Sequence, residues 1–212
     1  MGKYKETFET WNKVASAYQA KFMDLALYDD TYDLFCEAIT HDQARIVDVG
    51  CGPGNITRYL LSKDPTFQVL GIDVAPNMIQ LAQSNNPTAS FKVMDGRRLA
   101  ELDSTYHGII CGFCLPYLSP ADAAKLLADA SNLLLEDGVL YLSFVEGDPS
   151  KSGFQVGSSG DRVYFYYHAL ADLKTLLGKN QFSVLHIVRK DYLKTKSSKE
   201  IHTIVIAKKT AA

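Results

Sequence analysis

Apolar residues along this chain gather in short runs that alternate with segments of helical spacing. Runs typical of buried strands lie at residues 46–49, 67–73, 91–96, 106–113 and 138–145. Between these runs, apolar residues recur at intervals of three and four positions, which is the period of an amphipathic helix. Strands that alternate with helices of these lengths predict a parallel α/β sheet.

Helical spacing also precedes and follows this alternation. Two helices are expected before the sheet, over residues 8–22 and 28–39, and another is expected from residue 170. A helix over residues 120–135 has a clear start, since Ser119 suits an N-cap and proline at position 120 suits a first turn. Residues 147–161 are rich in glycine and serine, and we expect them to form a loop after the fifth strand.

The segment of residues 45–55, RIVDVGCGPGN, carries the strongest functional signal. Its apolar strand leads to Asp48 and then to glycines at alternate positions, Gly50, Gly52 and Gly54. Glycine lets a backbone approach a ligand where any Cβ would collide. The helix that follows offers amide donors and a positive dipole end at its N-terminus. Because doubly wound sheets bind ligands at the carboxyl ends of their strands, this segment predicts a nucleotide-type cradle.

Acidic residues close the next two strands. Asp73 ends the second strand, where an acid of a βαβ unit accepts both hydroxyls of a ribose. Asp95 ends the third strand and is followed by Gly96. A simple Asp-Gly turn is the alternative for Asp95, and a structural acid that satisfies the turn's own amides is the alternative for Asp48.

Composition limits the range of functions. The 212 residues suit one domain with a sizeable core, and the net charge of −2 gives no reason to propose a nucleic-acid partner. No apolar stretch approaches the roughly 18–20 residues that span a bilayer, so we expect no membrane partner. The four cysteines have no framework-like spacing, which favours a reducing compartment, with the cytoplasm as the default. The sequence gives no expectation for the oligomeric state.

Several of these motifs, in this order, resemble the class I S-adenosylmethionine-dependent methyltransferases. The resemblance covers DVGCGPG at residues 48–54, GID at 71–73, MDG at 94–96 and LLLEDGVLYLSF at 133–144. Residues 182–189 and 200–208 are similar to the closing antiparallel hairpin of this family. The resemblance implies a three-layer α/β sandwich around a mostly parallel seven-stranded sheet with a terminal antiparallel hairpin. It also implies a single domain over residues 1–212, with a helical cap at 1–42 and an α/β core at 43–212.

The resemblance further implies which residues bind the cofactor, S-adenosyl-L-methionine. Gly50 and Gly52 would face its methionine part, Asp73 the ribose hydroxyls and Asp95 the adenine amino group, with apolar side chains beside the adenine ring. The full expected set is Tyr18, Asp48, Gly50, Cys51, Gly52, Gly54, Asp73, Val74, Met78, Met94, Asp95, Gly96, Cys111 and Phe113.

The expected reaction is methyl transfer to a small-molecule acceptor by in-line displacement, with S-adenosyl-L-homocysteine as the second product. The sulfonium is already activated, so a base is needed only for a poorly nucleophilic acceptor. No catalytic residue stands out, and the candidates are His168, Glu146 and Tyr117. The other histidines, including His202, are interpreted as bystanders. The acceptor would lie between the cap helices, residues 113–117, Glu146 and the 147–161 loop, which is either a lid or a simple connection.

Other classes of protein remain open. A protein that binds S-adenosylmethionine without turnover, such as a sensor, would share the cradle. A nicotinamide-dependent oxidoreductase would share the strand, the glycines and the ribose acid, but the dinucleotide fingerprint is G-x-G-x-x-G and this chain has G-x-G-x-G. Cys111-x-x-Cys114 has the spacing of half a zinc site, but we see no second pair of ligands at suitable spacing and expect no metal.

Overall fold

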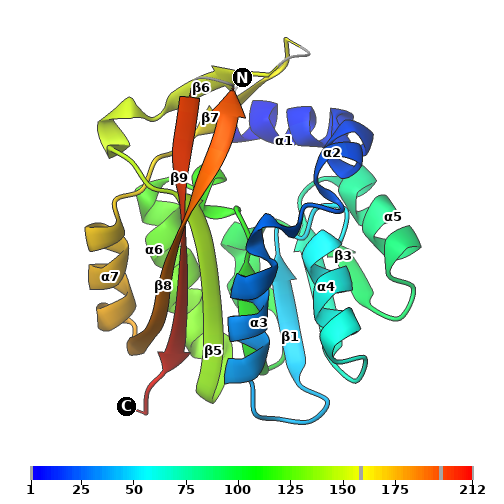
Figure 1. Cartoon of the computed structure of the whole chain (residues 1–212), viewed down its shortest axis with the longest axis vertical. Coiled ribbons are helices and arrows are strands. Elements are labelled where there is room, and N and C mark those ends of the chain that lie inside the picture. Colours follow the sequence, from blue (N-terminus) through cyan, green and yellow to red (C-terminus); the bar gives the residue numbers. More distant parts are fainter. Residues whose placement is uncertain (1, 158–159, 196–197, 212) are drawn as a thin grey trace.

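The computed structural model describes residues 2–157, 160–195 and 198–211, and it is built around a seven-stranded sheet (Figure 1). The strand order is β3-β2-β1-β4-β5-β9-β8, with β1 to β5 parallel and β9 antiparallel to both of its neighbours. The predicted Rossmann-like fold with a terminal antiparallel hairpin is confirmed. The strands are β1 (Arg45–Val49), β2 (Gln68–Asp73), β3 (Ser90–Val93), β4 (Tyr106–Cys111), β5 (Leu134–Val145), β8 (Phe182–Thr195) and β9 (Ser198–Lys209).

Helices cover both faces of this sheet. The helices α3 (Asp29–Ala38) and α4 (Asn55–Lys63) pack on one face, and α6 (Pro120–Leu133) and α7 (Leu170–Lys179) pack on the other. Above the carboxyl ends of the parallel strands lie α1 (Lys3–Lys13) and α2 (Ala15–Phe22), which contact α5 (Pro76–Asn85). Short 3-10 turns occur at Ala26–Tyr28, Gly96–Glu101, Leu115–Tyr117 and Pro149–Lys151.

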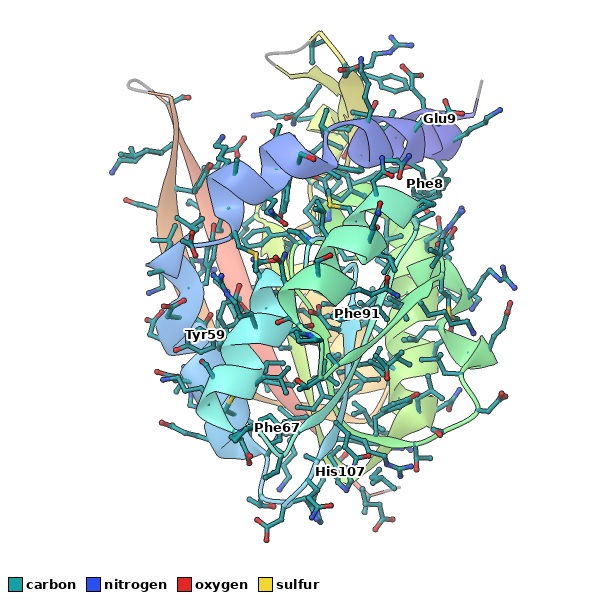
Figure 2. The ribbon with its side chains drawn as sticks, turned by 90° about the vertical axis from the view of Figure 1, so that its right-hand side faces the viewer. Phe8, Glu9, Tyr59, Phe67, Phe91 and His107 are labelled. Carbon is teal, nitrogen blue, oxygen red and sulfur yellow. The ribbon has the colours of Figure 1, made fainter. Side chains whose placement is uncertain are left out.

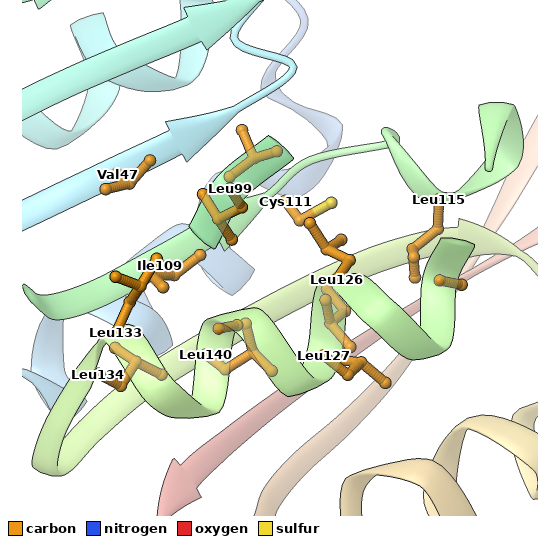
Figure 3. Packing of buried hydrophobic residues seen from close by; sticks show 14 of the residues in the cluster. Val47, Leu99, Ile109, Cys111, Leu115, Leu126, Leu127, Leu133, Leu134 and Leu140 are labelled. Carbon is orange, nitrogen blue, oxygen red and sulfur yellow. The ribbon is translucent and has the colours of Figure 1, made fainter. Parts of the chain in front are cut away.

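Alternating side chains divide the strands between two cores. Ile46 contributes to the core beneath α3 and α4, whereas its neighbour Val47 contributes to the core beneath α6, as the period of two in a strand requires. Figure 3 shows Val47, Ile109 and Leu140 of the sheet against Leu126 and Leu127 of α6. Each large apolar side chain buried in this way contributes about 1.5–3 kcal/mol of stability.

The predicted start of α6 is confirmed. The Ser119 hydroxyl accepts a hydrogen bond from the Asp122 amide at 3.2 Å, and Pro120 occupies the first turn. The helix ends at Leu133 rather than near 135, and β5 begins directly at Leu134. The sequence around Gly138 therefore belongs to the strand, in which Asp137 has a φ of +63°.

Two segments differ more strongly from the sequence prediction. The first predicted helix is two helices, because Val14 leaves helical geometry at φ −93° and ψ +10° and separates α1 from α2. The predicted loop at 147–161 contains β6 (Gly153–Val156), which pairs with β7 (Arg162–Phe165) as an antiparallel hairpin. Backbone pairing satisfies the polar groups of β6, so a strand forms there although glycine and serine surround it.

This β6–β7 hairpin packs on α1. The Tyr164 amide donates to the Thr7 hydroxyl at 2.9 Å, and the Thr10 hydroxyl donates to the Arg162 carbonyl at 2.9 Å. Figure 2 shows α1, with Phe8 and Glu9, lying directly beneath the hairpin. The division into a cap at 1–42 and a core at 43–212, within one domain, stays a prediction. Among the described residues, no helix is both long and apolar enough to cross a membrane.

Candidate functional site

The glycine turn follows β1 and is fixed to β2 by its backbone. The amides of Gly50 and Cys51 donate to the Ile72 carbonyl at 2.8 and 3.0 Å. Gly50, Gly52 and Gly54 have φ values of +69°, +53° and +81°, a region that favours glycine. The sequence therefore needs glycine at these three positions for backbone conformation alone.

Gly52 and Gly54 face different surroundings. A Cβ on Gly52 would have the Tyr18 ring at 3.7 Å as its nearest neighbour, so Gly52 borders open space. A Cβ on Gly54 would lie 2.4 Å from the Asn86 side-chain nitrogen, which itself donates to the Gly54 carbonyl at 3.0 Å. Gly54 thus allows α4 to pack closely on α5.

The open space beside Gly52 is a pocket of about 780 Å³, which we call the glycine-turn pocket. It lies at the carboxyl ends of the parallel strands and beneath α1. Most of the residues expected to bind the cofactor line it, together with residues that the sequence did not single out. The lining residues are Phe8, Trp11, Tyr18, Gly50, Gly52, Asp73, Val74, Met78, Met94, Asp95, Gly96, Gly112, Phe113, Cys114, Tyr117 and Leu118.

Asp73 is held by backbone amides at the edge of this pocket. One carboxylate oxygen accepts from the Gly52 amide at 2.9 Å and the other accepts from the Ala75 amide at 2.8 Å. Burial raises the pKa of Asp73, while these amide donors act to lower it. Asp73 therefore braces the glycine turn, and each of its oxygens retains a lone pair for a further donor.

Asp95 has a partner that the sequence analysis missed. Arg97 holds its carboxylate with nitrogen–oxygen distances of 2.5 and 3.0 Å, and the guanidinium lies 4.0 Å from the centre of the Tyr4 ring. The local signal was available, because Arg97 is only two residues beyond Asp95 and the chain makes a short 3-10 turn there. This ion pair fixes the direction of Asp95 at the end of β3.

Four of the expected cofactor residues do not line the glycine-turn pocket. Asp48 is fully buried behind the turn and accepts from the Thr57 hydroxyl at 2.8 Å. Burial raises its pKa to about 7. Cys111 packs into the core beneath α6, Gly54 faces α5, and Cys51 borders a second pocket. A role of these four residues in cofactor binding stays a prediction.

The second pocket, which we call the aromatic pocket, has a volume of about 900 Å³. It shares Trp11, Tyr18, Gly50, Phe113 and Tyr117 with the glycine-turn pocket, so the two pockets adjoin. The Trp11 ring makes edge contacts with Tyr18 and Tyr117, with centroids 5.5 and 5.2 Å apart. Its other lining residues include Phe22, Leu25, Tyr28, Tyr32, Cys51, Asn55, Ile56, Pro116, Val145, Phe165, Tyr192, Glu200 and His202.

His202 is a polar residue of the aromatic pocket that the sequence analysis interpreted as a bystander. It lies on β9, and its Nδ1 is 2.6 Å from the Tyr28 hydroxyl oxygen. The Tyr192 ring stacks on it at 4.5 Å and 12°. A buried histidine within the apolar run of β9 was the available signal, since an unpaired imidazole is costly in a core.

The three catalytic candidates from the sequence lie in different places. Tyr117 lines both pockets, and burial raises its pKa far above the ordinary value. His168 is buried with its Nε2 2.9 Å from the Leu115 carbonyl oxygen, and burial lowers its pKa. Glu146 pairs with Arg189 at 2.8 Å and accepts from the Thr203 hydroxyl at 2.7 Å. Neither His168 nor Glu146 lines the two pockets, so the structure brings only Tyr117 of these three to them.

Comparison with known proteins supports one family. A family described as "Methyltransferase domain" matches residues 46–138. The chain is 28% identical over 148 residues to a demethylmenaquinone methyltransferase of Deinococcus radiodurans, covering 68% of this chain and 58% of that protein. It is 43% identical over 101 residues to a trans-aconitate 2-methyltransferase of Variovorax paradoxus, covering 48% of this chain and 38% of that protein.

The similarities are therefore to S-adenosylmethionine-dependent methyltransferases, and the family match covers residues 46–138 of the chain. Its fold matches the solved structure of magnesium protoporphyrin IX methyltransferase from Synechocystis PCC 6803, with a TM-score of 0.74 and 17% identity over 99% of this chain and 100% of that one. A methyltransferase from Clostridium acetobutylicum matches with a TM-score of 0.73 and 17% identity over 95% of this chain and 100% of that one. The chain spans 58% or less of the length of the two sequence relatives named above.

The residues of the glycine-turn pocket suit the cofactor of this family chemically. S-adenosylmethionine carries a carboxylate, an ammonium, a sulfonium, a ribose and an adenine. Carboxylates suit the hydroxyls and the amino group, and aromatic faces suit the sulfonium. A side chain on Gly52 would narrow the space beside it, so glycine at this position lets a ligand approach the backbone closely.

Proposed function

We propose that this protein transfers the methyl group of S-adenosylmethionine to a small-molecule acceptor. The observation that carries the proposal is the junction of two pockets at the glycine turn. The glycine-turn pocket has carboxylates at strand ends, and the aromatic pocket adjoins it through Trp11, Tyr18 and Tyr117. One pocket suits the methyl donor and the other suits an acceptor.

Each end of the glycine-turn pocket receives a part of the cofactor in this proposal. The turn at Gly50 and Gly52 receives the methionine part, and Asp73 receives the ribose hydroxyls. Asp95, fixed by Arg97, receives the adenine amino group, and the buried side chains of Met78 and Met94 flank the ring. The lone pairs that Asp73 keeps beyond its two amide bonds are available to the hydroxyl donors.

The junction between the pockets is where the reaction takes place in this proposal. Bound S-adenosylmethionine supplies a methyl group that is already activated by a positive sulfur. The aromatic faces of Trp11, Tyr18 and Tyr117 stabilise positive charge at the junction. Alignment of the acceptor about 3 Å from the methyl carbon and in line with sulfur is then the main task of the chain. The helices α1 and α2, which lie above the strand ends, limit the access of water to the junction.

The names of the relatives do not settle the acceptor, because they refer to compounds as different as demethylmenaquinone and trans-aconitate. A protein that binds the cofactor without turnover would need the glycine-turn pocket, but it would not need the aromatic pocket as a second site for an acceptor. The volume and lining of the aromatic pocket therefore favour an enzyme.

The test is cofactor binding together with methyl transfer. We expect Asp73→Ala to weaken S-adenosylmethionine binding by one to several orders of magnitude, because two charge-assisted hydrogen bonds contribute roughly 1.5–3 kcal/mol each. Calorimetric titration measures this change, and release of S-adenosylhomocysteine across a panel of small molecules measures turnover. Asp73→Asn, which keeps the side chain's size beside the Gly52 amide, separates the loss of charge from a loosened turn.

Exposed Asp103 provides the matched control, and Asp103→Ala should bind like the unmodified protein. An affinity of Asp73→Ala within about threefold of the unmodified protein would remove the ribose assignment, since a roughly threefold change is less than one charge-assisted hydrogen bond contributes. Tight cofactor binding without turnover of any acceptor would favour the non-catalytic alternative.

A further inference from the structure

The imidazole of His202 has one nitrogen engaged and one nitrogen available. Nδ1 is 2.6 Å from the Tyr28 hydroxyl oxygen, and both groups are buried. Nε2 is buried and has no hydrogen-bond partner within the described part of the chain. A buried polar atom without a partner is costly, so its retention in a pocket wall indicates a ligand that completes it.

Flat aromatic rings surround this imidazole. The Tyr192 ring is nearly parallel to it at 4.5 Å, and the Phe113 ring lies 4.8 Å away at 55°. Rigid aromatic walls bury a flat ligand at little cost in side-chain entropy and add favourable ring–ring contacts. The aromatic pocket is therefore shaped by its lining for a flat ring rather than for a flexible chain.

We propose that the aromatic pocket binds an aromatic acceptor with an O–H or N–H group, and that this group hydrogen-bonds to Nε2 of His202. This inference rests on the proposed function and deepens it. As the acceptor's lone pair forms the bond to the methyl carbon, the carbon–sulfur bond breaks and its electron pair returns to sulfur. The acceptor's proton passes to Nε2, so one positive charge leaves the sulfur and one appears on the imidazole.

The neighbours of His202 suit both the hydrogen bond from the acceptor to Nε2 and the transfer of its proton to Nε2. The Tyr28 oxygen accepts from Nδ1–H in this tautomer, which leaves the lone pair of Nε2 free for the acceptor. Burial raises the pKa of Tyr28, so that its hydroxyl stays neutral. The nearest carboxylate oxygen of Glu200 is 3.8 Å from Nε2 and stabilises the imidazolium that forms. Lys190 is paired with His202 across the strands, and its ammonium binds Asp30 at 2.6 Å.

The experiment measures acceptor binding directly, without requiring turnover. Protein saturated with S-adenosylhomocysteine is titrated by calorimetry with a panel of mono- and bicyclic phenols and aromatic amines, each paired with its O- or N-methylated analogue. We expect the hydroxy or amino compound to bind roughly three- to tenfold more tightly than its methylated partner, the range that one hydrogen bond gives. His202→Asn, which keeps a polar atom near Tyr28 but removes Nε2, should abolish this difference.

Exposed His186 on β8 gives the matched control, and His186→Asn should leave the difference unchanged. Where an acceptor is turned over, the loss of kcat in His202→Asn should be large for weakly acidic acceptors and small for acceptors that ionise by themselves. A purely structural role of His202 would lower kcat equally for both kinds of acceptor.

Two results separate this inference from the proposed function. A protein that does not bind S-adenosylmethionine refutes the proposed function. A protein that binds S-adenosylhomocysteine tightly, but binds no compound of the panel or binds both partners of each pair equally, overturns the inference alone. Unchanged discrimination in His202→Asn overturns it as well.

Discussion

Two aspartates on neighbouring strands have opposite surroundings at the glycine turn. Asp73 lies in front of the turn, where two backbone amides bind its carboxylate. Asp48 lies behind the turn, fully buried, with one oxygen bound by Thr57 and the other without a partner among the described residues. The same residue type therefore lines a pocket in one case and carries a desolvation cost in the other.

This cost predicts a pH dependence of stability. Burial raises the pKa of Asp48 from 3.8 to about 7, so between these values the folded protein holds a proton that the unfolded chain has lost. The contribution of Asp48 is thus most favourable below pH 3.8, falls as the pH rises to about 7, and is constant above it. We expect Asp48→Asn to be more stable than the unmodified protein at pH 8, by up to about 4 kcal/mol.

Urea unfolding at pH 4, 6 and 8 measures this effect. The advantage of Asp48→Asn should grow across the series, and Asp103→Asn, at an exposed position, should show no such trend. Parallel pH profiles for Asp48→Asn and the unmodified protein would contradict the prediction.

At this scale, local patterns predicted residues at strand ends and turns, but they missed the ion pair of Asp95 with Arg97, only two residues away. Asp73 and the glycines of the turn were found because a strand end and a turn contain them. His202 was missed because its partner, Tyr28, is 174 residues away. Their contact depends on β9 lying between β5 and β8, and an apolar run does not specify its neighbours in a sheet.

At the scale of elements, the glycine turn combines a pocket wall with a helix contact. Gly52 borders the glycine-turn pocket, whereas Gly54 allows α4 and α5 to touch. Both have positive φ, so a substitution at either position costs about 1–2 kcal/mol in backbone strain. Only the direction of the added side chain differs.

This pair of glycines predicts two distinct defects. Gly52→Val should lose cofactor affinity with a modest decrease in the thermal midpoint. Gly54→Val should lower the midpoint further, because its side chain meets Asn86 and Ala82 at 2.4 and 3.3 Å. Calorimetric titration and thermal unfolding of both variants measure these effects. Retained tight binding in Gly52→Val would mean that the cradle is placed wrongly.

Element types were easier to predict than element ends and pairings. The strands β1 to β5 and the start of α6 follow from apolar runs and a capping pattern. The hairpin of β6 and β7 was not predicted, because its strands satisfy each other's backbone without a long apolar run. The extension of β8 and β9 beyond the predicted ranges has the same cause, as cross-strand pairing continues from Lys190 to Thr195.

At the scale of the whole molecule, α1 and the β6–β7 hairpin form one roof over the two pockets. Besides the Thr7 contact, Lys13 binds Asp161 at 2.8 Å and Glu6 pairs with Arg162. Because α1 also carries Phe8 and Trp11 into the pockets, ligand contacts and hairpin contacts share one helix.

This shared roof predicts coupled protection. Hydrogen exchange in α1 and in residues 153–156 and 162–165 should slow together when S-adenosylhomocysteine and an acceptor are added. Thr7→Val removes the oxygen that accepts from the Tyr164 amide, so the hairpin should lose its share of the protection while α1 keeps it. Thr175→Val, on the exposed side of α7, is the control. Exchange that is unchanged with both ligands present would contradict the predicted coupling of α1 and the hairpin, and with it the lid alternative.

The position of Trp11 also allows ligand binding to be followed by the intrinsic fluorescence of the protein. It is the single tryptophan of the chain, and its ring borders both pockets between Tyr18 and Tyr117. Indole emission responds to nearby charge and to ring contacts, so the proposed sulfonium in one pocket and the proposed flat ring in the other would act on the same fluorophore. The fluorescence of Trp11 should therefore report the binding of both the methyl donor and the acceptor, without a label attached to the chain.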